Sequence, residues 1–247
     1  MTALSLVRLA IDPAALADFG AAQGASDDCN GYAIHLALRW RYGQTAPQPF
    51  CLRMSDLRHV HLLGYTTSPE QLSEAHSLPG TNDLLERVFP DAPVVRAMPR
   101  IWAPGARYRF EVRVRPVVRY GSRIRQLRAA ADGAWQRNAR EVDAFVAACE
   151  RASGQRIARE DVYREWLRSR LENKAELEHA HLVSTHRVRS RRSSHGRSEH
   201  AYVEGVEAVL RGTLRVTDGP LFEAYLKRGV GRHAAFGNGM LLLSPSS

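Results

Sequence analysis

The feature that most constrains this chain is a glycine-rich stretch close to its C-terminus. Residues 229–239 read Gly-Val-Gly-Arg-His-Ala-Ala-Phe-Gly-Asn-Gly, which places four glycines within eleven residues. Glycine lets a backbone approach another group closely, and successive free N–H groups in such a stretch attract anions. The Gly-Lys-Ser/Thr ending of a Walker loop is missing, and no residue of the stretch is a nucleophile. We therefore expect a binding loop for an anionic ligand.

Regular elements are predicted on both sides of this loop. Asp218 can cap a helix over residues 221–228, a proline sits in its first turn, and Gly229 follows its last residue. Residues 212–216 before the helix and the apolar residues 240–243 after the loop have the pattern of strands. The predicted order is strand, helix, glycine loop, strand.

The charge of the chain favours a polyanionic partner. Its 247 residues carry a formal net charge of +9, and all but two of the 35 Lys and Arg residues are arginine. Arginine holds phosphate through two parallel hydrogen bonds and stacks on bases. A strongly basic small protein meets nucleic acid more often than an acidic membrane surface.

The three cysteines limit the compartment and the chemistry. Cys29, Cys51 and Cys149 are far apart and form no Cys-x-x-Cys pair, so we expect neither a zinc site nor a disulfide framework. The sequence shows neither a signal peptide nor a stretch long enough to cross a membrane. The prediction is a cytoplasmic protein that needs no metal or other cofactor and does not bind membranes.

The N-terminal half has the element order of a ferredoxin-like fold, which is strand–helix–strand–strand–helix–strand. We read residues 14–28, which are small and loosely patterned, as a loop with no more than a turn of helix. The predicted strands are 3–11, 50–54, 59–65 and 94–99, and the predicted helices are 29–42, 70–76 and 83–89.

The second half begins with a strictly alternating strand. Its apolar residues occupy one face, and Arg107, Arg109, Arg113 and Arg115 occupy the other, opposed only by Glu111. An ordinary solvated face usually mixes charges of both signs. We therefore favour contact of these arginines with RNA over a merely solvated face.

Residues 123–172 have the apolar spacing of a helical hairpin. We predict that the aromatic residues of this segment belong to the core and not to a base-stacking platform. Contact with RNA and contact with a partner subunit both remain open as its function. The residues at helical spacing are Trp135, Ala139, Val142, Phe145, Val146 and Cys149, then Val162, Trp166, Leu167 and Leu171.

A basic run, residues 187–197, follows a predicted strand over 177–188. We read the run as a loop that leads to strand residues 201–216, interrupted near Gly205. Such a loop fits a groove of structured RNA, although a solvated loop of this composition would also be basic. We expect it to be mobile alone and ordered on a phosphate backbone. Its arginines are Arg187, Arg189, Arg191, Arg192 and Arg197.

The helix over residues 29–42 carries the candidate catalytic residues. Tyr32, His35 and Arg39 are three and then four residues apart, so one helix face presents a phenol, an imidazole and a guanidinium. Histidine moves protons near neutral pH, tyrosine can orient a nucleophile, and arginine can stabilise charge developing on a phosphate. This trio suits cleavage of RNA by its own 2′-hydroxyl. On spacing alone, a tyrosine and a histidine one turn apart are more often packing residues.

These motifs resemble a known family. Gly-Val-Gly-Arg-x-x-Ala-Phe-Gly-x-Gly-Met-Leu, preceded by Gly-x-Leu-x-Val-x-Asp, is similar to the C-terminal signature of CRISPR-associated endonucleases that process repeat RNA. The branch that serves type I-E effector complexes resembles it most, and type IV systems carry related versions. This branch has a Tyr-x-x-His pair at the start of its first helix, which matches Tyr32 and His35, and then a Pro-Phe strand, which matches Pro49-Phe50. The resemblance covers residues 1–65, 107–119 and 165–247.

The chain departs from the family pattern at three positions. The family often has lysine before Ala-Phe-Gly, where this chain has Ala234 preceded by His233, and its residue between the last two glycines is usually apolar or aromatic, where this chain has Asn238. A further basic residue on the first helix is not lysine here. Arg39 or Arg41 must take its place, and we prefer Arg39 because it shares a helix face with His35.

The resemblance implies an α+β fold of two tandem ferredoxin-like (RRM-like) domains, with a helical insertion in the second. The predicted domains are residues 1–98 and 99–247, joined near 95–105, with the glycine loop of the second domain near the first long helix. It implies a metal-independent endoribonuclease that cuts once at the 3′ base of a CRISPR repeat hairpin. The products would carry a 2′,3′-cyclic phosphate and a 5′-hydroxyl.

The resemblance also assigns roles and partners. His35 would act in acid–base catalysis, Tyr32 would position the reacting groups, and Arg39 would stabilise charge. The protein would keep its RNA, turn over once or slowly, and join the other subunits of a type I-E or type IV effector complex. Besides the strand and loop arginines above, the residues expected to bind RNA are Arg41, Gly229, Gly231, Arg232, His233, Gly237 and Gly239.

Two other functions stay open. A non-catalytic RNA-binding subunit would have the same fold and basic surface, with Tyr32 and His35 merely packed. A DNA-binding regulator is a weaker alternative, because the sequence offers no convincing helix-turn-helix.

Overall fold

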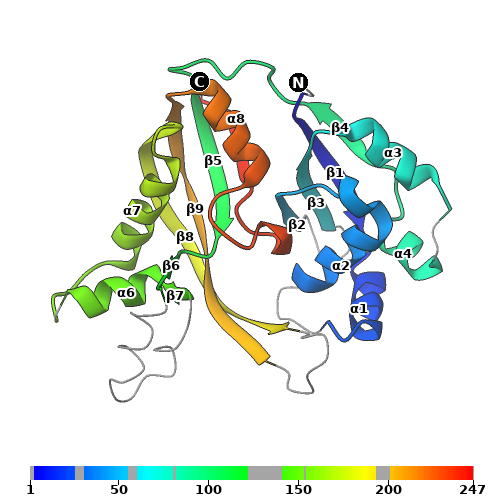
Figure 1. Cartoon of the computed structure of the whole chain (residues 1–247), viewed down its shortest axis with the longest axis horizontal. Coiled ribbons are helices and arrows are strands. Elements are labelled where there is room, and N and C mark those ends of the chain that lie inside the picture. The colour runs from blue at the N-terminus through cyan, green and yellow to red at the C-terminus, as the bar shows by residue number, and fades with distance from the viewer. Residues whose placement is uncertain are drawn as a thin grey trace.

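The computed structural model describes residues 3–25, 31–54, 60–79, 82–121, 141–152, 154–192 and 201–246. Two antiparallel four-stranded sheets organise it, in the orders β2-β3-β1-β4 and β10-β5-β9-β8. Figure 1 shows two lobes side by side, with helix α8 and the loop that follows it between them. The boundary that we predict between two domains falls in the connection between β4 and β5.

The first sheet is built from strands whose alternate residues face its helices. Val7 and Leu9 of β1 and Leu62 of β3 are buried against Phe19 and Ile34 of the covering helices. The elements are β1 Ser5–Ile11, α1 Pro13–Ala22, α2 Gly31–Tyr42, the 3-10 helix η1 Gly43–Thr45, β2 Phe50–Met54, β3 Val60–Thr66, α3 Pro69–Ser77, α4 Asp83–Val88 and β4 Val94–Ala97.

The interpretation of residues 14–28 as a loop is wrong for most of that stretch, because α1 occupies Pro13–Ala22. The Asp12 side chain caps this helix, with its Oδ1 accepting from the N–H groups of Ala14 at 2.8 Å and Ala15 at 3.0 Å. Alanine-rich segments have high helix propensity, and burial of Leu16 and Phe19 fixes the helix on the sheet. The Asp-Pro pair that ends β1 is therefore also a helix start signal.

The second sheet repeats the topology of the first. In each, the first and third strands lie at the centre, the fourth lies beside the first, and the second lies beside the third, which is the ferredoxin-like arrangement. The predicted fold class is confirmed. The elements are β5 Arg107–Val114, β6 Val117–Arg119, β7 Glu141–Asp143, α6 Ala144–Arg151, α7 Arg159–Leu171, β8 Ala175–Arg192, β9 Ala201–Val216, α8 Gly219–Arg228, the 3-10 helix η2 Ala234–Phe236 and β10 Leu241–Pro245.

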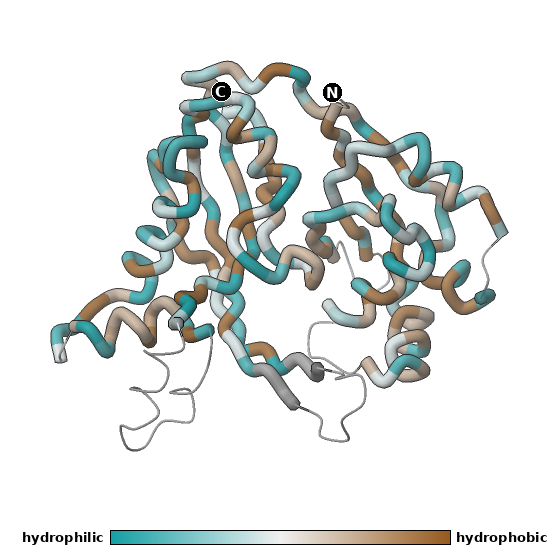
Figure 2. Tube along the Cα trace, viewed as in Figure 1, coloured by the Kyte–Doolittle hydropathy of each residue, from teal (hydrophilic) through white to brown (hydrophobic). Residues whose placement is uncertain are grey.

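Helices α7 and α8 cover one face of this second sheet. Tyr163 and Leu167 of α7 and Phe222 of α8 are fully buried with Val112 of β5 and Leu210 of β9. As predicted, apolar and charged residues alternate along β5. Figure 2 shows the same alternation of colour along the strands. The apolar face of β5 therefore belongs to the core, and its charged face is turned away from α7 and α8.

The segment 123–172 is not wholly a helical insertion. Val142 lies in the short strand β7, and α6 begins only at Ala144, because Asp143 caps it by accepting from the N–H of Phe145 at 2.7 Å. Helix α7 is the crossover helix between β5 and β8 that the ferredoxin-like topology itself requires. Trp135 and Ala139 of the predicted hairpin lie outside the described residues.

The hairpin of β8 and β9 is longer than the sequence pattern predicts. Strand β8 runs to Arg192, so only the later part of the predicted loop 187–197 lies between the strands. Strand β9 passes through Gly205, which pairs with Val188, so the predicted interruption there is also wrong. The long ladder of β pairing overrides the weak strand propensity of glycine at residue 205.

The first lobe has its own core, and a few of its apolar residues join the core of the second lobe. Leu4, Cys51 and Tyr65 of the first lobe belong to the same apolar cluster as the core of the second sheet. The buried hydroxyl of Tyr65 donates to the carbonyl oxygen of Leu241 at 2.7 Å. Burial raises the pKa of the Cys51 thiol to about 11, which keeps it protonated and inert within this interface.

Candidate active site

The glycine-rich loop has the predicted position between α8 and β10, and it contains the 3-10 helix η2, which the sequence analysis missed. All four of its glycines adopt positive φ, between 75° and 83°. At Gly239 a Cβ atom would lie 2.5 Å from the carbonyl oxygen of Val230, and at Gly231 it would lie 2.9 Å from the Trp166 ring. Glycine is therefore required here both by backbone conformation and by close packing.

Not all backbone N–H groups of the loop are free for an anion. The N–H of Gly229 donates to the carbonyl oxygen of Tyr225 at 2.8 Å, and that of Gly239 donates to the carbonyl oxygen of Arg113 at 2.6 Å. These two glycines hold the loop in place. Any backbone contact to an anion must come from the middle of the loop.

The middle of the loop rests on the first lobe. A Cβ atom at Gly31, the first residue of α2, would lie 2.7 Å from the carbonyl oxygen of Phe236, and one at Gly237 would lie 3.3 Å from the Phe50 ring. The sequence analysis expected the loop to lie near the first long helix, and the structure brings the two together (Figure 1).

Tyr32 and His35 project from α2 beside this loop. The ring of Phe236 lies 5.3 Å from the His35 ring and 6.3 Å from the Tyr32 ring, between centroids. The Tyr32 and His35 rings lie 6.5 Å apart. The sequence analysis quoted Phe236 only as part of the loop motif. Phe236 is an aromatic residue among small ones, and this contrast could have predicted that its ring contacts the first long helix.

The environment of His35 favours its neutral form. Burial and the positive charge of Arg39 hold the pKa of His35 below its usual 6.5, while a hydrogen bond to the backbone of Ala235 acts in the opposite direction. The imidazole is half-buried and not enclosed in the apolar interior. A neutral imidazole at neutral pH can accept a proton.

Arg39 and Arg41 occupy different environments. Arg39 is exposed and close enough to His35 to affect its titration. The Arg41 guanidinium points instead toward the end of α3, where it donates to the carbonyl oxygens of Ala75 at 2.7 Å and His76 at 2.5 Å. The geometry supports the preference for Arg39, and it gives Arg41 a structural position that competes with its predicted contact to RNA.

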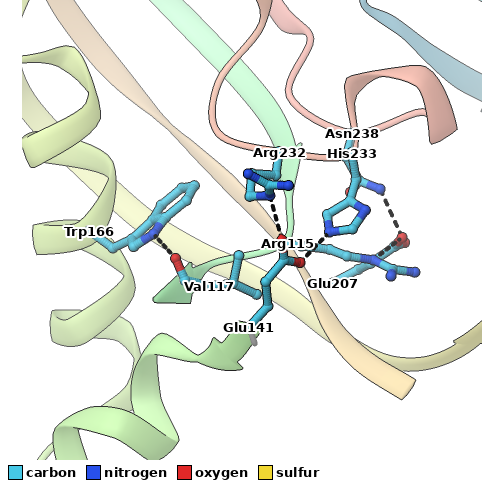
Figure 3. A network of polar contacts seen from close by, with 8 residues as sticks. All are labelled: Arg115, Val117, Glu141, Trp166, Glu207, Arg232, His233 and Asn238. Atoms are coloured by element: carbon cyan, nitrogen blue, oxygen red, sulfur yellow. Dashed lines mark hydrogen bonds and ion pairs between the residues drawn. The ribbon is translucent and has the colours of Figure 1, made fainter. Parts of the chain in front are cut away.

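A carboxylate that the sequence analysis missed contacts both Arg232 and His233 of the loop. Glu141 of β7 accepts from Arg232 Nε at 2.5 Å and from His233 Nε2 at 3.0 Å (Figure 3). His233 has a left-handed backbone conformation with φ of 66°, which is uncommon for a residue with a side chain. Burial and Arg115 lower the pKa of His233 more than Glu141 raises it. A single glutamate within a segment read as a helical hairpin gave no sequence signal for this contact.

A second carboxylate lies beneath the loop. Glu207 of β9 is buried, and it accepts from Asn238 Nδ2 at 3.0 Å and from Arg115 Nε at 3.3 Å (Figure 3). Asn238 is wholly buried, so the polar residue at a family position that is usually apolar is explained by its partner Glu207. Arg115 is 6 % exposed. Its predicted place on an open basic face is therefore wrong, because it follows the last residue of β5 and pairs with the buried Glu207.

The charged face of β5 is more balanced than the sequence alone indicated. Glu111 pairs with Arg53 and Arg211, and Glu178 of β8, which lies on the far side of β9 from β5, pairs with Arg107 at 2.8 Å. Glu178 comes from a strand that the sequence of β5 cannot show. Arg113 lies 4.0 Å from Glu207, and Arg109 is exposed, with no ion pair to the described residues.

The arginines of the β8–β9 hairpin are partly described. Arg187 is exposed, and Arg189 pairs with Glu204 across the hairpin at 3.2 Å. Arg191 and Arg192 lie at the end of β8, and Arg197 lies outside the described residues. Their contact with RNA stays a prediction.

Two general findings concern the described part of the chain. It contains no group of three or more His, Cys, Asp or Glu side chains placed to hold a metal ion. Within the same ranges, no helix is long and apolar enough to span a membrane.

Comparisons with known proteins agree with this architecture. The CRISPR endoribonuclease Cse3 bound to a 19-nucleotide RNA has 20% identity and a TM-score of 0.64, covering 98% of this chain and all of that one. Thermus thermophilus Cse3 bound to an RNA representing a pre-cleavage complex has 17% identity and a TM-score of 0.60, with coverage of 98% and 100%. A chain of a CRISPR RNA-guided surveillance complex has 15% identity and a TM-score of 0.54, also with coverage of 98% and 100%.

At this level of identity, these structures establish the fold. A search of curated protein sequences finds no match. The model of one family, described as CRISPR associated protein, matches residues 4–245. With its tandem ferredoxin-like fold and a match over almost its full length, the chain belongs to this family of CRISPR-associated proteins.

Proposed function

We propose that the protein is an endoribonuclease that binds the hairpin of a CRISPR repeat and cuts it at the 3′ base to release guide RNA. The observation that carries this proposal is the meeting of His35 with the glycine-rich loop at Phe236. His35, a group that can transfer a proton, thereby lies beside a loop that carries the exposed, charged side chain of Arg232. Two of the similar structures hold RNA, and they are described as CRISPR endoribonucleases or as pre-cleavage complexes of Cse3.

The proposed reaction uses the RNA's own 2′-hydroxyl. His35, neutral because of its lowered pKa, accepts the proton of the 2′-hydroxyl, and the oxygen attacks the adjacent phosphorus. The bond from phosphorus to the 5′-oxygen breaks, and this oxygen takes up the proton that His35 accepted, which returns the imidazole to its neutral form. The products are a 2′,3′-cyclic phosphate and a 5′-hydroxyl, and no metal ion takes part.

The remaining residues have supporting roles in this proposal. Tyr32, on the same helix face, orients the 2′-hydroxyl or the phosphate. Arg39 stabilises the negative charge that grows on the phosphorane oxygens. Arg109 and Arg187, which are exposed cations, and the middle of the glycine loop contribute to holding the phosphate backbone.

We also propose that the protein keeps its RNA and joins an effector complex of type I-E or type IV. A likeness to a chain of an RNA-guided surveillance complex supports this proposal. A subunit that retains its product turns over once.

The test is cleavage of a labelled repeat RNA in the presence of EDTA. The wild-type protein should cut once, and His35→Ala should slow the single-turnover rate by about 10²- to 10⁴-fold while the RNA affinity stays the same. An RNA with a 2′-deoxynucleotide at the cut site should bind and remain whole. A requirement for Mg²⁺, or full activity of His35→Ala, would refute the mechanism.

A second function is favoured by one observation. The His35 imidazole packs against Phe236 and is hydrogen-bonded to the backbone at Ala235, as a purely structural histidine would be. A non-catalytic RNA-binding subunit would show full affinity for the repeat and produce no cut RNA. In that case His35→Ala would lower the stability of the protein and change nothing else.

A further inference from the structure

The Arg232 guanidinium and the His233 imidazole are two donor groups of the glycine-rich loop, and both contact one carboxylate. Glu141 presents Oε1 to Arg232 and Oε2 to His233, so the two donors contact the two oxygens of one planar anionic group (Figure 3). A phosphodiester also offers two anionic oxygens to such a pair of donors. The carboxylate is therefore placed where an RNA phosphate would be held.

This ion pair adjoins the proposed cleavage site. The ring of Phe236 contacts both histidines, with its centroid 6.2 Å from that of His233 and 5.3 Å from that of His35. An RNA strand whose reacting phosphate lies at His35 would therefore carry a neighbouring phosphate along the loop toward Arg232 and His233.

The ion pair between Glu141 and Arg232 is exposed enough for a phosphate to replace the carboxylate. The Arg232 side chain is 50% exposed and that of Glu141 24% exposed, so solvent weakens the attraction between them. Glu207, the other carboxylate at the loop, is buried beneath Asn238 and Arg115 and is shielded from exchange. The two glutamates therefore have different roles. Glu207 anchors the loop from below, and Glu141 contacts the donor groups on its outer surface.

We propose that Glu141 is a built-in competitor of RNA, which holds Arg232 and His233 in the free protein and is displaced from them by a backbone phosphate on binding. The inference rests on the proposed function, since it assumes that RNA reaches the loop. Glu141 lowers the affinity for any RNA and keeps the loop in a defined conformation until RNA arrives.

The experiment measures RNA affinity as a function of salt for two ligands. One is the repeat hairpin with a 2′-deoxynucleotide at the cut site, and the other is poly(U), which reports phosphate contacts without sequence. Glu141→Gln should bind both about 2- to 5-fold more tightly than wild type, which is the strength of a partly exposed ion pair. Arg232→Gln should bind both more weakly and lower the slope of log K against log salt by about 0.7 to 0.9.

Two controls separate this effect from general electrostatics. Glu172→Gln removes the same charge from an exposed position at the end of α7, and it should leave both affinities within the error of wild type. In the presence of Arg232→Gln, adding Glu141→Gln should produce no further gain, because the cation that it frees is gone. Thermal unfolding of each variant shows whether it is folded.

The outcomes are distinct. Weaker binding by Glu141→Gln, or binding equal to that of Glu172→Gln, would overturn the inference and make Glu141 a structural brace of the loop. If Glu141→Gln does not fold, an unchanged salt slope in Arg232→Gln would overturn it as well. A wild-type protein that prefers the hairpin no more than poly(U) would refute the proposed function, while the poly(U) series would still decide the role of Glu141.

Discussion

The rings of His35 and Phe236 lie 5.3 Å apart, although one belongs to the first long helix and the other to the loop before the last strand. Neither lobe alone could hold this pair. The contact couples the proposed chemistry to the way the two lobes are packed.

We expect Phe236→Ala to reduce the single-turnover cleavage rate by about 10-fold or more, because small displacements of a catalytic group cost rate steeply. RNA affinity should change less than the rate. Single-turnover cleavage assays with saturating protein, quenched at successive times, measure the rate. Trp40→Ala is the control, because Trp40 is an exposed aromatic residue of α2 that packs on Phe19. Equal rates for Phe236→Ala and wild type would mean that the contact plays no part in catalysis.

Arg39 and Arg41 provide a matched pair two residues apart. Arg41→Ala should lose about 1.5–3 kcal/mol of unfolding free energy, because it removes charged donors from carbonyl groups at the end of α3. Its cleavage rate should stay near wild type. Arg39→Ala should show the reverse, with about 10-fold slower cleavage and an unfolding free energy within about 0.5 kcal/mol of that of wild type. Urea denaturation and cleavage assays on both variants check this, and a rate loss confined to Arg41→Ala would exchange the two roles.

The stability of the protein should fall as the pH is lowered below about 6.5. The pKa values of His35, His76 and His233 are all lowered in the folded protein, chiefly by burial. The unfolded chain therefore binds protons at a higher pH than the folded one, and stability is lost from the ordinary histidine pKa downward until the folded groups titrate. The midpoint of urea unfolding measured from pH 7.5 to 5 tests this. His76→Asn should flatten part of the decline, and an unchanged midpoint across the range would contradict the prediction.

The two kinds of ion pair in the second sheet should differ in strength. Glu207→Ala leaves the buried Arg115 without its carboxylate and should cost about 3–5 kcal/mol of unfolding free energy. Glu176→Ala breaks the exposed pair with Arg215 on the same sheet and should cost about 0–1 kcal/mol. Chemical denaturation of the two variants measures the difference. Similar costs would show that the Glu207 network is open to solvent.

Local signals in the sequence determined much of this protein. Asp218 and Gly229 fixed the ends of α8, the alternation along residues 107–114 fixed the strand β5 and its apolar face, and spacing placed Tyr32 and His35 on one face of a helix. These predictions succeed because capping, alternation and helical period act between residues that are close in the chain. The resemblance of the glycine-rich motif supplied the tandem fold.

Only the tertiary structure decided which charged groups meet. Arg115 is buried against Glu207 of β9, which also accepts from Asn238 of the loop. Arg232 and His233 both contact Glu141 of β7. Ion pairs between residues that are far apart in the chain produce no periodic pattern in the sequence. Many acidic and basic residues could pair, and only the packing of the fold selects which ones do. The contact of His35 with Phe236 has the same origin, so the sequence named the candidate groups and the fold decided their neighbours.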